Sequence, residues 1–407
     1  MSVPRSIILV TNKFPFKGGE PFLESEIDFL AAVFDNIWIF PLESHDEELL
    51  VMPDNVNVVL WKPAEKTKLK TILVRHGFRI AGLFLKEFII SPKRFKYLSE
   101  FKFNFYRVVG LINDAEILVK ELKPLLEKTN NKIYSYWFND NVSRLVLTRW
   151  FGLKLEIVTR VHLYDFEEEF NSRGYLPFRY SEMKLVKQVV PISEYARTYL
   201  KKRFKGLNNI TDVCRLGAKP GKFNPGNTGE EWRIVTCSSL TWYKRPLLLS
   251  DLMASFKGKI HWVHFGSGNM KDAFLEKASG LPDNIKFDYM GHVSNSEILE
   301  YYNNQGVDVL LNVSNFEGIP FSMIEAIAAG IPVIGCNICG VPELVCKETG
   351  LLLNNEPNPK DTAIQIRYFL ERKARNLEFR MGVKSFWEMK YNAYNNYIQF
   401  IKIITNE

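Results

Sequence analysis

The stretch FEGIPFSMIEAIAAGIPVIG (316–335) carries two glutamates, Glu317 and Glu325, at a point where a buried strand is expected to pass into a helix. The residues before it, VDVLLNVS (307–314), are apolar and rich in Val and Leu, which is typical of a strand in a parallel sheet. A Gly-Ile-Pro turn follows, and apolar residues at helical spacing then predict a helix over 321–329, ended by the next Gly and Pro. The first carboxylate is therefore expected just past a strand's carboxyl end, and the second in a helix's first turns.

This arrangement aims two acidic side chains and the backbone N–H groups of a helix start at one crevice. The amino end of a helix attracts an anionic phosphate, and a carboxylate can accept hydrogen bonds from both hydroxyls of a ribose or hexose. The site therefore suits a sugar joined to a phosphate. The alternative is that both glutamates are solvated acids of an ordinary helix start, where they suit the helix dipole.

Strands and helices alternate through the rest of the chain. The first half has strand candidates at 6–12, 36–42, 132–138, 154–161 and 187–193. After a loop rich in Gly, Pro and Asn (216–231), the pattern restarts with candidates at 232–240, 259–266 and 285–291. Such alternation is typical of a doubly wound parallel sheet, and the restart predicts a second α/β domain.

The block around the two glutamates resembles the E-x7-E signature of retaining glycosyltransferases of family four, which have the two-domain GT-B fold. The resemblance covers nearly the whole chain, apart from residues 62–107. It implies an acceptor-binding Rossmann-like domain over 1–217 and a nucleotide-sugar-binding one over 218–384, facing each other across a cleft. It also implies a C-terminal helix over 385–407 that packs back on the first domain, and a role in bacterial surface-polysaccharide or lipopolysaccharide assembly.

A basic loop follows the strand candidate 232–240. Lys244 and Arg245 at a strand's carboxyl end suit the neutralisation of a pyrophosphate. The family usually has an Arg five positions before this Lys, whereas Ser239 stands there in this chain. We expect Arg245 to supply the missing charge; a surface lysine is the alternative for Lys244.

Glycine-rich loops complete the expected donor site. Gly18 and Gly19 follow the first strand candidate, where glycine lets a backbone approach a phosphate or sugar closely, and the Glu-Pro-Phe-Leu after them resembles the family's Glu-Thr-Phe-Ile. The resemblance places Glu317 on the donor sugar and Glu325 on the ribose. Its further donor contacts are Gly266, Gly268, His292, Gly318, Phe321 and Ser322.

His162 lies in RVHLYDFEEEF (160–170), after a strand candidate and three positions before Asp165. A single His near a strand end is often a structural hydrogen-bonding residue. The segment resembles the family motif Arg-Ala-His-Gly-Tyr-Asp, which implies that His162 contacts the transferred sugar and stabilises an oxyanion. Asp165 is expected to contact the acceptor.

The resemblance implies a hexosyltransferase that moves a hexose from a nucleoside-diphosphate sugar to a hydroxyl of a glycan or lipid-linked acceptor, with retention. Catalysis would depend on neutralising the leaving diphosphate. No two aspartates are separated by one residue, so no metal is expected, and no cofactor beyond the donor substrate. Two other classes stay open: a sugar-nucleotide epimerase of the same layout, and a non-catalytic protein that binds membranes or nucleic acid.

Composition fits a soluble α/β protein: 407 residues that are 46% hydrophobic can bury two cores. The longest apolar stretches are too short or too charged to span a bilayer, and the first is too short for a signal-peptide core. Five cysteines without a regular framework agree with a reducing compartment, so a cytoplasmic location is expected. The C-x-x-C of Cys336 and Cys339, with Cys346 nearby, has no second ligand pair or nearby His to complete a metal site.

The net charge of +7 is concentrated in one segment. Residues 62–107 contain twelve Lys and Arg against three Glu, interleaved with aromatic and aliphatic residues. This mixture suits an anionic membrane surface or a lipid-linked phosphate acceptor, which would make the protein peripheral on the inner face of the membrane. A solvated basic helical face is the alternative, and nucleic acid is disfavoured because no nucleic-acid module accompanies the charge.

Overall fold

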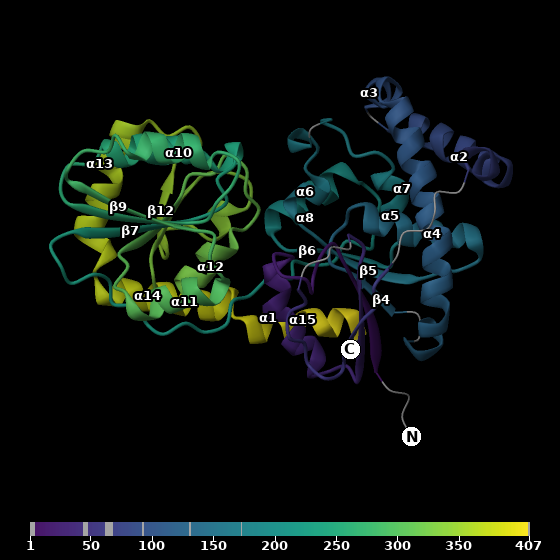
Figure 1. Cartoon of the computed structure of the whole chain (residues 1–407), viewed down its shortest axis with the longest axis horizontal. Helices are drawn as coiled ribbons and strands as arrows, with labels where there is room; N and C mark the ends of the chain where they lie inside the picture. The colour runs from purple at the N-terminus through teal and green to yellow at the C-terminus, as the bar shows by residue number, and fades with distance from the viewer. Residues whose placement is uncertain are drawn as a thin grey trace. The chain divides into compact units, whose positions relative to one another are not determined.

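The computed structural model describes residues 5–43, 48–61, 68–91, 93–129, 132–171 and 173–405. The chain divides into two compact units (Figure 1). Unit 1 contains the chain up to Ile192, the segment Ala196–Cys214 and the residues from Phe400 onward, whereas unit 2 contains Ser193–Tyr195 and Arg215–Gln399. The chain thus passes from the first unit to the second after Cys214, close to the expected boundary at residue 217.

Unit 1 is built on a six-stranded parallel sheet with the order β3-β2-β1-β4-β5-β6. Ile8 of the central strand pairs with Trp38 on one side and Ile133 on the other. Every residue of this strand is buried, as expected where helices cover both faces of a sheet. The strands are β1 (Ser6–Thr11), β2 (Asn36–Pro41), β3 (Val56–Val58), β4 (Lys132–Ser135), β5 (Glu156–Val161) and β6 (Gln188–Pro191).

Unit 2 repeats this plan with the order β12-β11-β10-β7-β8-β9. Counted from its own first strand, this is the same winding as in unit 1, with the first and fourth strands adjacent at the centre. In such sheets a crevice forms at the carboxyl ends of these two strands, where the strand order reverses. The strands are β7 (Trp232–Cys237), β8 (Ile260–Phe265), β9 (Ile285–Gly291), β10 (Val309–Asn312), β11 (Val333–Cys336) and β12 (Gly350–Leu353). The predicted fold class, two doubly wound Rossmann-like domains, is confirmed.

Helices cover both sheets (Figure 1). The helices up to the crossing into unit 2 are α1 (Pro21–Ala31), α2 (Leu69–Ile90), α3 (Arg94–Ser99), α4 (Phe101–Thr129), α5 (Asp140–Leu147), α6 (Leu163–Phe166), α7 (Arg179–Met183) and α8 (Glu194–Arg203). Those that follow are α9 (Pro246–Ala254), α10 (Lys271–Ala278), α11 (Asn295–Asn304), α12 (Phe321–Ala328), α13 (Pro359–Phe369), α14 (Leu377–Lys390) and α15 (Ala393–Thr405). Short helical turns occur at Thr148–Phe151, Glu168–Phe170, Trp242–Lys244, Val341–Glu343 and Leu370–Ala374.

The end of α15 belongs to the core of unit 1. Phe400 packs against the ring of Tyr134 with a centroid distance of 4.7 Å, and the Arg160 guanidinium lies 3.6 Å from its ring centre. Arg160 also pairs with the buried Glu26 at 3.4 Å. The last described turns of the chain therefore contribute apolar and cation–π contacts to the N-terminal sheet.

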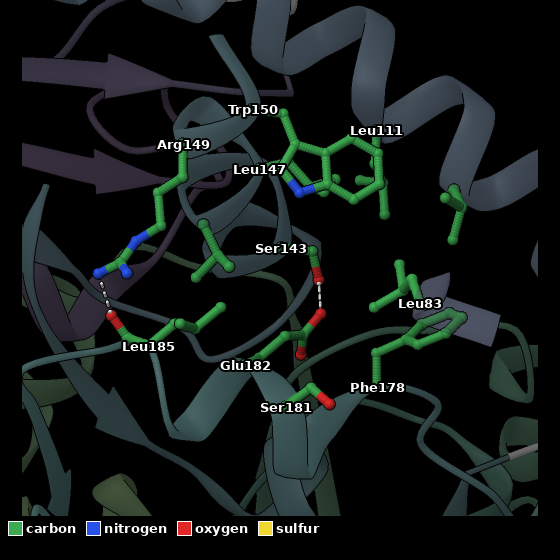
Figure 2. Close-up of a pocket in the computed structure, with 12 residues that line it drawn as sticks. Leu83, Leu111, Ser143, Leu147, Arg149, Trp150, Phe178, Ser181, Glu182 and Leu185 are labelled. Atoms are coloured by element: carbon green, nitrogen blue, oxygen red, sulfur yellow. Dashed lines mark hydrogen bonds between the residues drawn. The ribbon is translucent and has the colours of Figure 1, made fainter. Parts of the chain in front are cut away.

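A small cavity lies beneath α2 and α4 in unit 1 (Figure 2). Leu83, Leu111 and Trp150 line it, and at its edge Ser143 Oγ donates a hydrogen bond to Glu182 Oε1 at 2.5 Å. Its volume is about 90 Å³, well below the roughly 300–1,000 Å³ of ligand pockets. We interpret it as a packing void.

Among the described residues, no helix is both long and apolar enough to cross a bilayer. Residues 62–67, the start of the basic segment, lie outside the described residues. The expected cytoplasmic location stays a prediction.

Candidate functional site

An ion pair stands at the carboxyl ends of the two central strands of unit 2. Lys244 ends the helical turn after β7, and Glu317 follows β10. Lys244 Nζ lies 2.5 Å from Glu317 Oε2, and both side chains are largely buried. The loops that carry them are joined by a backbone hydrogen bond from Asn315 N to Tyr243 O at 2.9 Å. The structure therefore brings together two residues 73 positions apart at the reversal point of the sheet.

Helix α12 starts beside this pair. It begins at Phe321, as predicted, and Pro320 is its N-cap. Ser322 Oγ donates to Cys237 O at 3.3 Å, which ties the first turn of the helix to the end of β7. The partial positive charge of a helix start thus lies at the same crevice as the Lys244 ammonium, whose charge Glu317 balances, and it favours an anionic ligand there.

Glu325, in the same helix, is a buried carboxylate with a fixed partner. It is 5% exposed, and its Oε1 accepts a hydrogen bond from Asn295 Nδ2 at 2.6 Å. The thiol of Cys237 is nearby: burial, followed by the Glu325 charge, raises the pKa of this thiol to about 12 and keeps it neutral. Neither Glu325 nor Glu317 is a solvated helix-start acid, so that alternative is wrong.

The sequence did not point to Asn295. It is the first residue of α11, directly after Ser294, which forms a capping box with Glu297. The capping box is visible in the sequence as Ser-x-x-Glu and predicts where the helix begins. It does not predict that the first helical side chain meets a carboxylate on another helix.

The glycines after β8 allow close packing against the loop after β7. A Cβ on Gly266, whose φ is +126°, would lie 2.0 Å from Ser238 O, and one on Gly268 would lie 2.5 Å from Leu240 O. Gly318 is packed similarly, because a Cβ on Gly340 would lie 2.5 Å from its carbonyl oxygen. These glycines shape the crevice; their direct contact with a ligand stays a prediction.

Two of the expected donor residues lie away from the ion pair. The Arg245 guanidinium donates to Asn355 O at 2.6 Å and pairs with Glu356 at 2.7 Å. It would have to leave these partners to replace the Arg that is missing at Ser239. His292 is exposed and follows β9, the edge strand of the sheet, whereas Lys244 follows a central strand.

In unit 1, His162 is a buried imidazole that packs against aromatic rings. It is tilted against the rings of Tyr136 and Trp137, with centroid distances of 4.8 and 4.3 Å. Neither ring nitrogen has a hydrogen-bond partner among the described residues, and Asp165 Oδ2 lies 3.5 Å from Nδ1. Asp165 instead accepts from the backbone N–H of His162 at 2.8 Å. Because buried polar atoms are rarely left unbonded, this ring is poised to meet a water or a ligand.

The loop after β1 is closed by a carboxylate of the chain itself. Glu20 accepts hydrogen bonds from Asn12 N at 2.6 Å, Phe14 N at 2.6 Å and Trp137 Nε1 at 2.9 Å. Lys13 N donates to the same group at 3.1 Å. In the sequence, Glu20 appears only as the first residue of the Glu-Pro-Phe-Leu that resembles a family motif, and no role of its own was predicted for it.

These glycines permit the turn that brings Glu20 inward. Gly18 has a φ of +75°, which favours glycine, and a Cβ on Gly19 would lie 2.9 Å from Phe14 N. The close approach is therefore between parts of the loop. The predicted approach of a donor phosphate or sugar to Gly18 and Gly19 stays a prediction.

A pocket of about 520 Å³ opens at the carboxyl ends of β1, β4 and β5. Its volume lies within the range of ligand sites, roughly 300–1,000 Å³. Its lining combines amide, aromatic and charged side chains, as sugar binding requires. The residues that carry this chemistry are Asn12, Trp137, Asn139, Tyr164, Asp165 and Arg107. Asp165 thus lines this pocket, and its contact with an acceptor stays a prediction; Trp137 lines the pocket and also packs against His162.

Unit 2 contains a segment that is similar to a known protein family. Residues 220–385 match the family model "Glycosyl transferases group 1". This segment contains Lys244, Glu317 and Glu325, so the ion pair and the buried carboxylate all fall within the matched part of unit 2.

Curated relatives match parts of the chain. The O-antigen biosynthesis glycosyltransferase WbnH of Escherichia coli is 30% identical over 125 residues, 31% of this chain and 34% of its own length. The amylovoran biosynthesis glycosyltransferase AmsK of Erwinia amylovora is 24% identical over 206 residues, 47% of this chain and 50% of its own. The matches thus span between a third and a half of these relatives.

Solved structures resemble the whole chain. The lipopolysaccharide outer core galactosyltransferase WaaB has a TM-score of 0.66 at 15% identity, covering 98% of this chain and 99% of its own. HepE of Anabaena, in a complex with UDP and glucose, has a TM-score of 0.65 at 14% identity, covering 99% and 100%. Likeness at this identity establishes the fold, which is of the GT-B type.

Proposed function

We propose that the chain is a retaining glycosyltransferase that moves a hexose from a nucleoside-diphosphate sugar to a hydroxyl of a glycan or lipid-linked acceptor. The observation that carries this proposal is the Lys244–Glu317 pair at the start of α12, in the crevice of unit 2. Support also comes from the match of residues 220–385 to a glycosyltransferase model and from a structural neighbour that holds UDP and glucose.

On the donor side, each part of this crevice has a role. The Lys244 ammonium and the first turn of α12 neutralise the diphosphate as the bond between the sugar's anomeric carbon and the phosphate oxygen breaks. Glu317 accepts hydrogen bonds from donor sugar hydroxyls, and Glu325 accepts from the ribose. Asn295 acts through Glu325 by holding its carboxylate in place.

Retention follows if the acceptor oxygen attacks the face from which the diphosphate leaves. The acceptor hydroxyl forms the new bond to the anomeric carbon, and its proton passes to the departing diphosphate. No covalent sugar–enzyme bond is needed in this scheme. We propose that Lys244 and the helix start supply the positive charge, so that no divalent metal is required.

On the acceptor side, the pocket of unit 1 provides the binding surface. Asn139, Tyr164 and Asp165 can exchange hydrogen bonds with sugar hydroxyls, and Trp137 offers an aromatic face. His162, whose ring nitrogens have no hydrogen-bond partner in the described part of the chain, contacts the transferred sugar and stabilises negative charge on an oxygen.

The test is a donor screen followed by product analysis. Purified protein is heated with a panel of nucleoside-diphosphate sugars and free nucleoside diphosphates, with and without EDTA, because a ligand that binds the native state raises the melting temperature. We expect a selective shift that survives EDTA and is lost in Glu317→Gln. No shift with any donor would contradict the assignment of the crevice.

Product analysis then separates the reaction classes. Transfer with retention gives a glycoside whose anomeric configuration, measured by NMR, equals that of the donor. An epimerase would instead release an altered nucleotide sugar without any acceptor.

A further inference from the structure

Helix α2 is apolar on two opposite faces. One face, including Ile72, Ile80 and Phe84, is buried in unit 1. The opposite face presents Val74, Phe78, Leu85 and Ile89, with exposed fractions of 80%, 99%, 61% and 68%. At 3.6 residues per turn these four side chains fall within an arc of about 60°. A surface helix normally has one apolar stripe, so the second stripe needs an explanation.

The exposed stripe continues beyond α2. Phe95 and Leu98 of α3 and Phe101 at the start of α4 are 80%, 49% and 47% exposed. In Figure 1, α2 lies on the far side of α4 from the sheet of unit 1, and α3 lies at the upper end of α4. These helices therefore lie at the outer edge of this unit, and they carry the exposed apolar side chains.

The exposed charges on this part of the chain have one sign. Among the described side chains of residues 68–107, every exposed charged group is a cation. They are Lys68, Lys70, Arg75, Arg79, Lys86, Lys96 and Lys102. The two acids are not free: Glu87 is buried and accepts from Tyr175 Oη at 2.5 Å, and Glu100 pairs with Arg173. We name these cations, with the exposed apolar residues of α2 and α3, the α2–α3 surface.

We propose that the α2–α3 surface docks on an anionic lipid bilayer. Phe78, Leu85 and Ile89 enter the boundary between headgroups and acyl chains, and lysine and arginine side chains reach the lipid phosphates beside them. The combination of an apolar ridge and single-signed charge matches the two attractions that such a surface offers, acyl-chain contact and negative potential.

Other occupants fit the surface less well. A second copy of the chain would bring this same set of cations against itself, and like charges across an interface oppose association. A nucleic acid would accept the cations but would leave the aliphatic ridge of Val74, Leu85 and Ile89 without bases to stack on, since stacking requires aromatic or guanidinium planes.

Docking would also orient the acceptor pocket. Phe103, two residues after Phe101, and Arg107 of the same helix line the 520 Å³ pocket of unit 1. The pocket thus borders the α2–α3 surface. This consequence rests on the proposed function: docking brings an acceptor that is anchored in the bilayer within reach of the pocket. Vesicle binding itself requires neither a donor nor sugar transfer, so it can be tested independently.

The experiment measures sedimentation of the full-length chain with vesicles of pure phosphatidylcholine and of phosphatidylcholine with 30% phosphatidylglycerol. The test variant is Phe78→Ser with Ile89→Ser. The matched control is Ile364→Ser with Met389→Ser in unit 2, whose side chains are 68% and 73% exposed. A third variant, Lys70→Gln with Lys86→Gln, removes charge alone. Circular dichroism checks that each variant keeps its fold.

We expect tenfold or stronger binding of wild type to the anionic vesicles over the neutral ones, weakening as salt is added. The Phe78/Ile89 variant should lose at least tenfold and the charge variant a smaller factor, whereas the control pair should match wild type. Equal binding to both vesicle types, or an unchanged Phe78/Ile89 variant, overturns the proposal. If wild type does not bind vesicles but binds nucleic acid, the proposal is overturned. It is likewise overturned if wild type does not bind vesicles but forms a dimer that the Phe78/Ile89 variant does not form.

Discussion

The two units share one winding of strands but differ in what occupies the crevice at the centre of the sheet. In unit 2 the loops after the first and fourth strands present Lys244 and Glu317 beside the start of α12. In unit 1 the N–H groups after the first strand already bond to Glu20. A negative ligand in unit 2 thus meets a helix start and a lysine that it shares with Glu317, whereas the corresponding N–H donors of unit 1 bond to Glu20. Strand order locates a site, and the side chains that close it determine its ligand.

This difference suggests a division of labour between the units. The crevice of unit 2 suits a diphosphate, and the pocket of unit 1, with Asn139, Tyr164 and Trp137, suits the hydroxyls and ring faces of a sugar. Four predictions test this contrast, beginning with the largest expected effect.

Replacing Lys244 should have the largest effect on the transfer rate. We expect Lys244→Ala to lower the transfer rate by roughly 10²–10³-fold, which is typical for removing a group that stabilises developing negative charge. The measurement is single-turnover transfer at saturating donor. Lys259→Ala is the control, because Lys259 is also paired with a glutamate in unit 2 but is 70% exposed. A loss below about fivefold would show that the diphosphate is neutralised elsewhere.

Removing the Glu20 carboxylate should destabilise unit 1. Glu20→Ala leaves three backbone N–H groups and Trp137 Nε1 without their acceptor, and we expect a loss of about 3 kcal/mol in the free energy of unfolding. Denaturant titration measures it, with the exposed Glu24→Ala of α1 as control.

The same variant sharpens the comparison between the two crevices. Backbone N–H groups that converge on one point bind anions. Sulfate should therefore raise the melting temperature of Glu20→Ala more than that of wild type. An equal response would mean that the loop collapses instead of forming an anion site.

Acid should weaken unit 2 through His264. Burial lowers the pKa of this imidazole to about 4, and its Nδ1 lies 2.8 Å from Thr236 Oγ1. Between pH 6.5 and 4 the unfolded chain binds a proton that the folded chain does not, so stability is present above pH 6.5 and falls toward pH 4.

The expected loss at pH 4.5 is about 2.5 kcal/mol relative to pH 7.5. The stability difference between wild type and His264→Asn should shrink by this amount as the pH falls, measured by denaturant titration at each pH. A difference that is constant with pH would contradict a neutral buried His264.

The smallest effect is expected at Asn295. Asn295→Ala removes the amide that holds Glu325 and should weaken donor binding by about tenfold, equivalent to about 1.4 kcal/mol. If Glu325 contacts the ribose hydroxyls, Asn295→Ala should hardly change the affinity for a 2′,3′-dideoxynucleoside diphosphate, which lacks them. Calorimetry of both nucleotides checks this, with the exposed Asn304→Ala of the same helix as control. An equal loss of affinity for both nucleotides would contradict a contact between Glu325 and the ribose.

Local sequence patterns predicted the strand and helix around Glu317 closely. The predicted strand 307–314 contains β10, and the predicted helix 321–329 corresponds to α12. Apolar runs and Gly-Pro stops are local signals, so they locate such elements well. The predicted strand 232–240 extends past β7, because its last residues turn to bring Lys244 toward Glu317.

Sequence by itself determined the two α/β units, because alternating apolar strands and amphipathic helices can bury their faces only by layering. It also determined that Glu317 and Lys244 follow strands. Only the tertiary structure decided that they pair, that Asn295 holds Glu325, that Glu20 closes the crevice of unit 1, and that α2 keeps a second apolar face exposed. The physical reason is that these contacts depend on distances between segments far apart in the chain, on which periodicity and spacing carry no information.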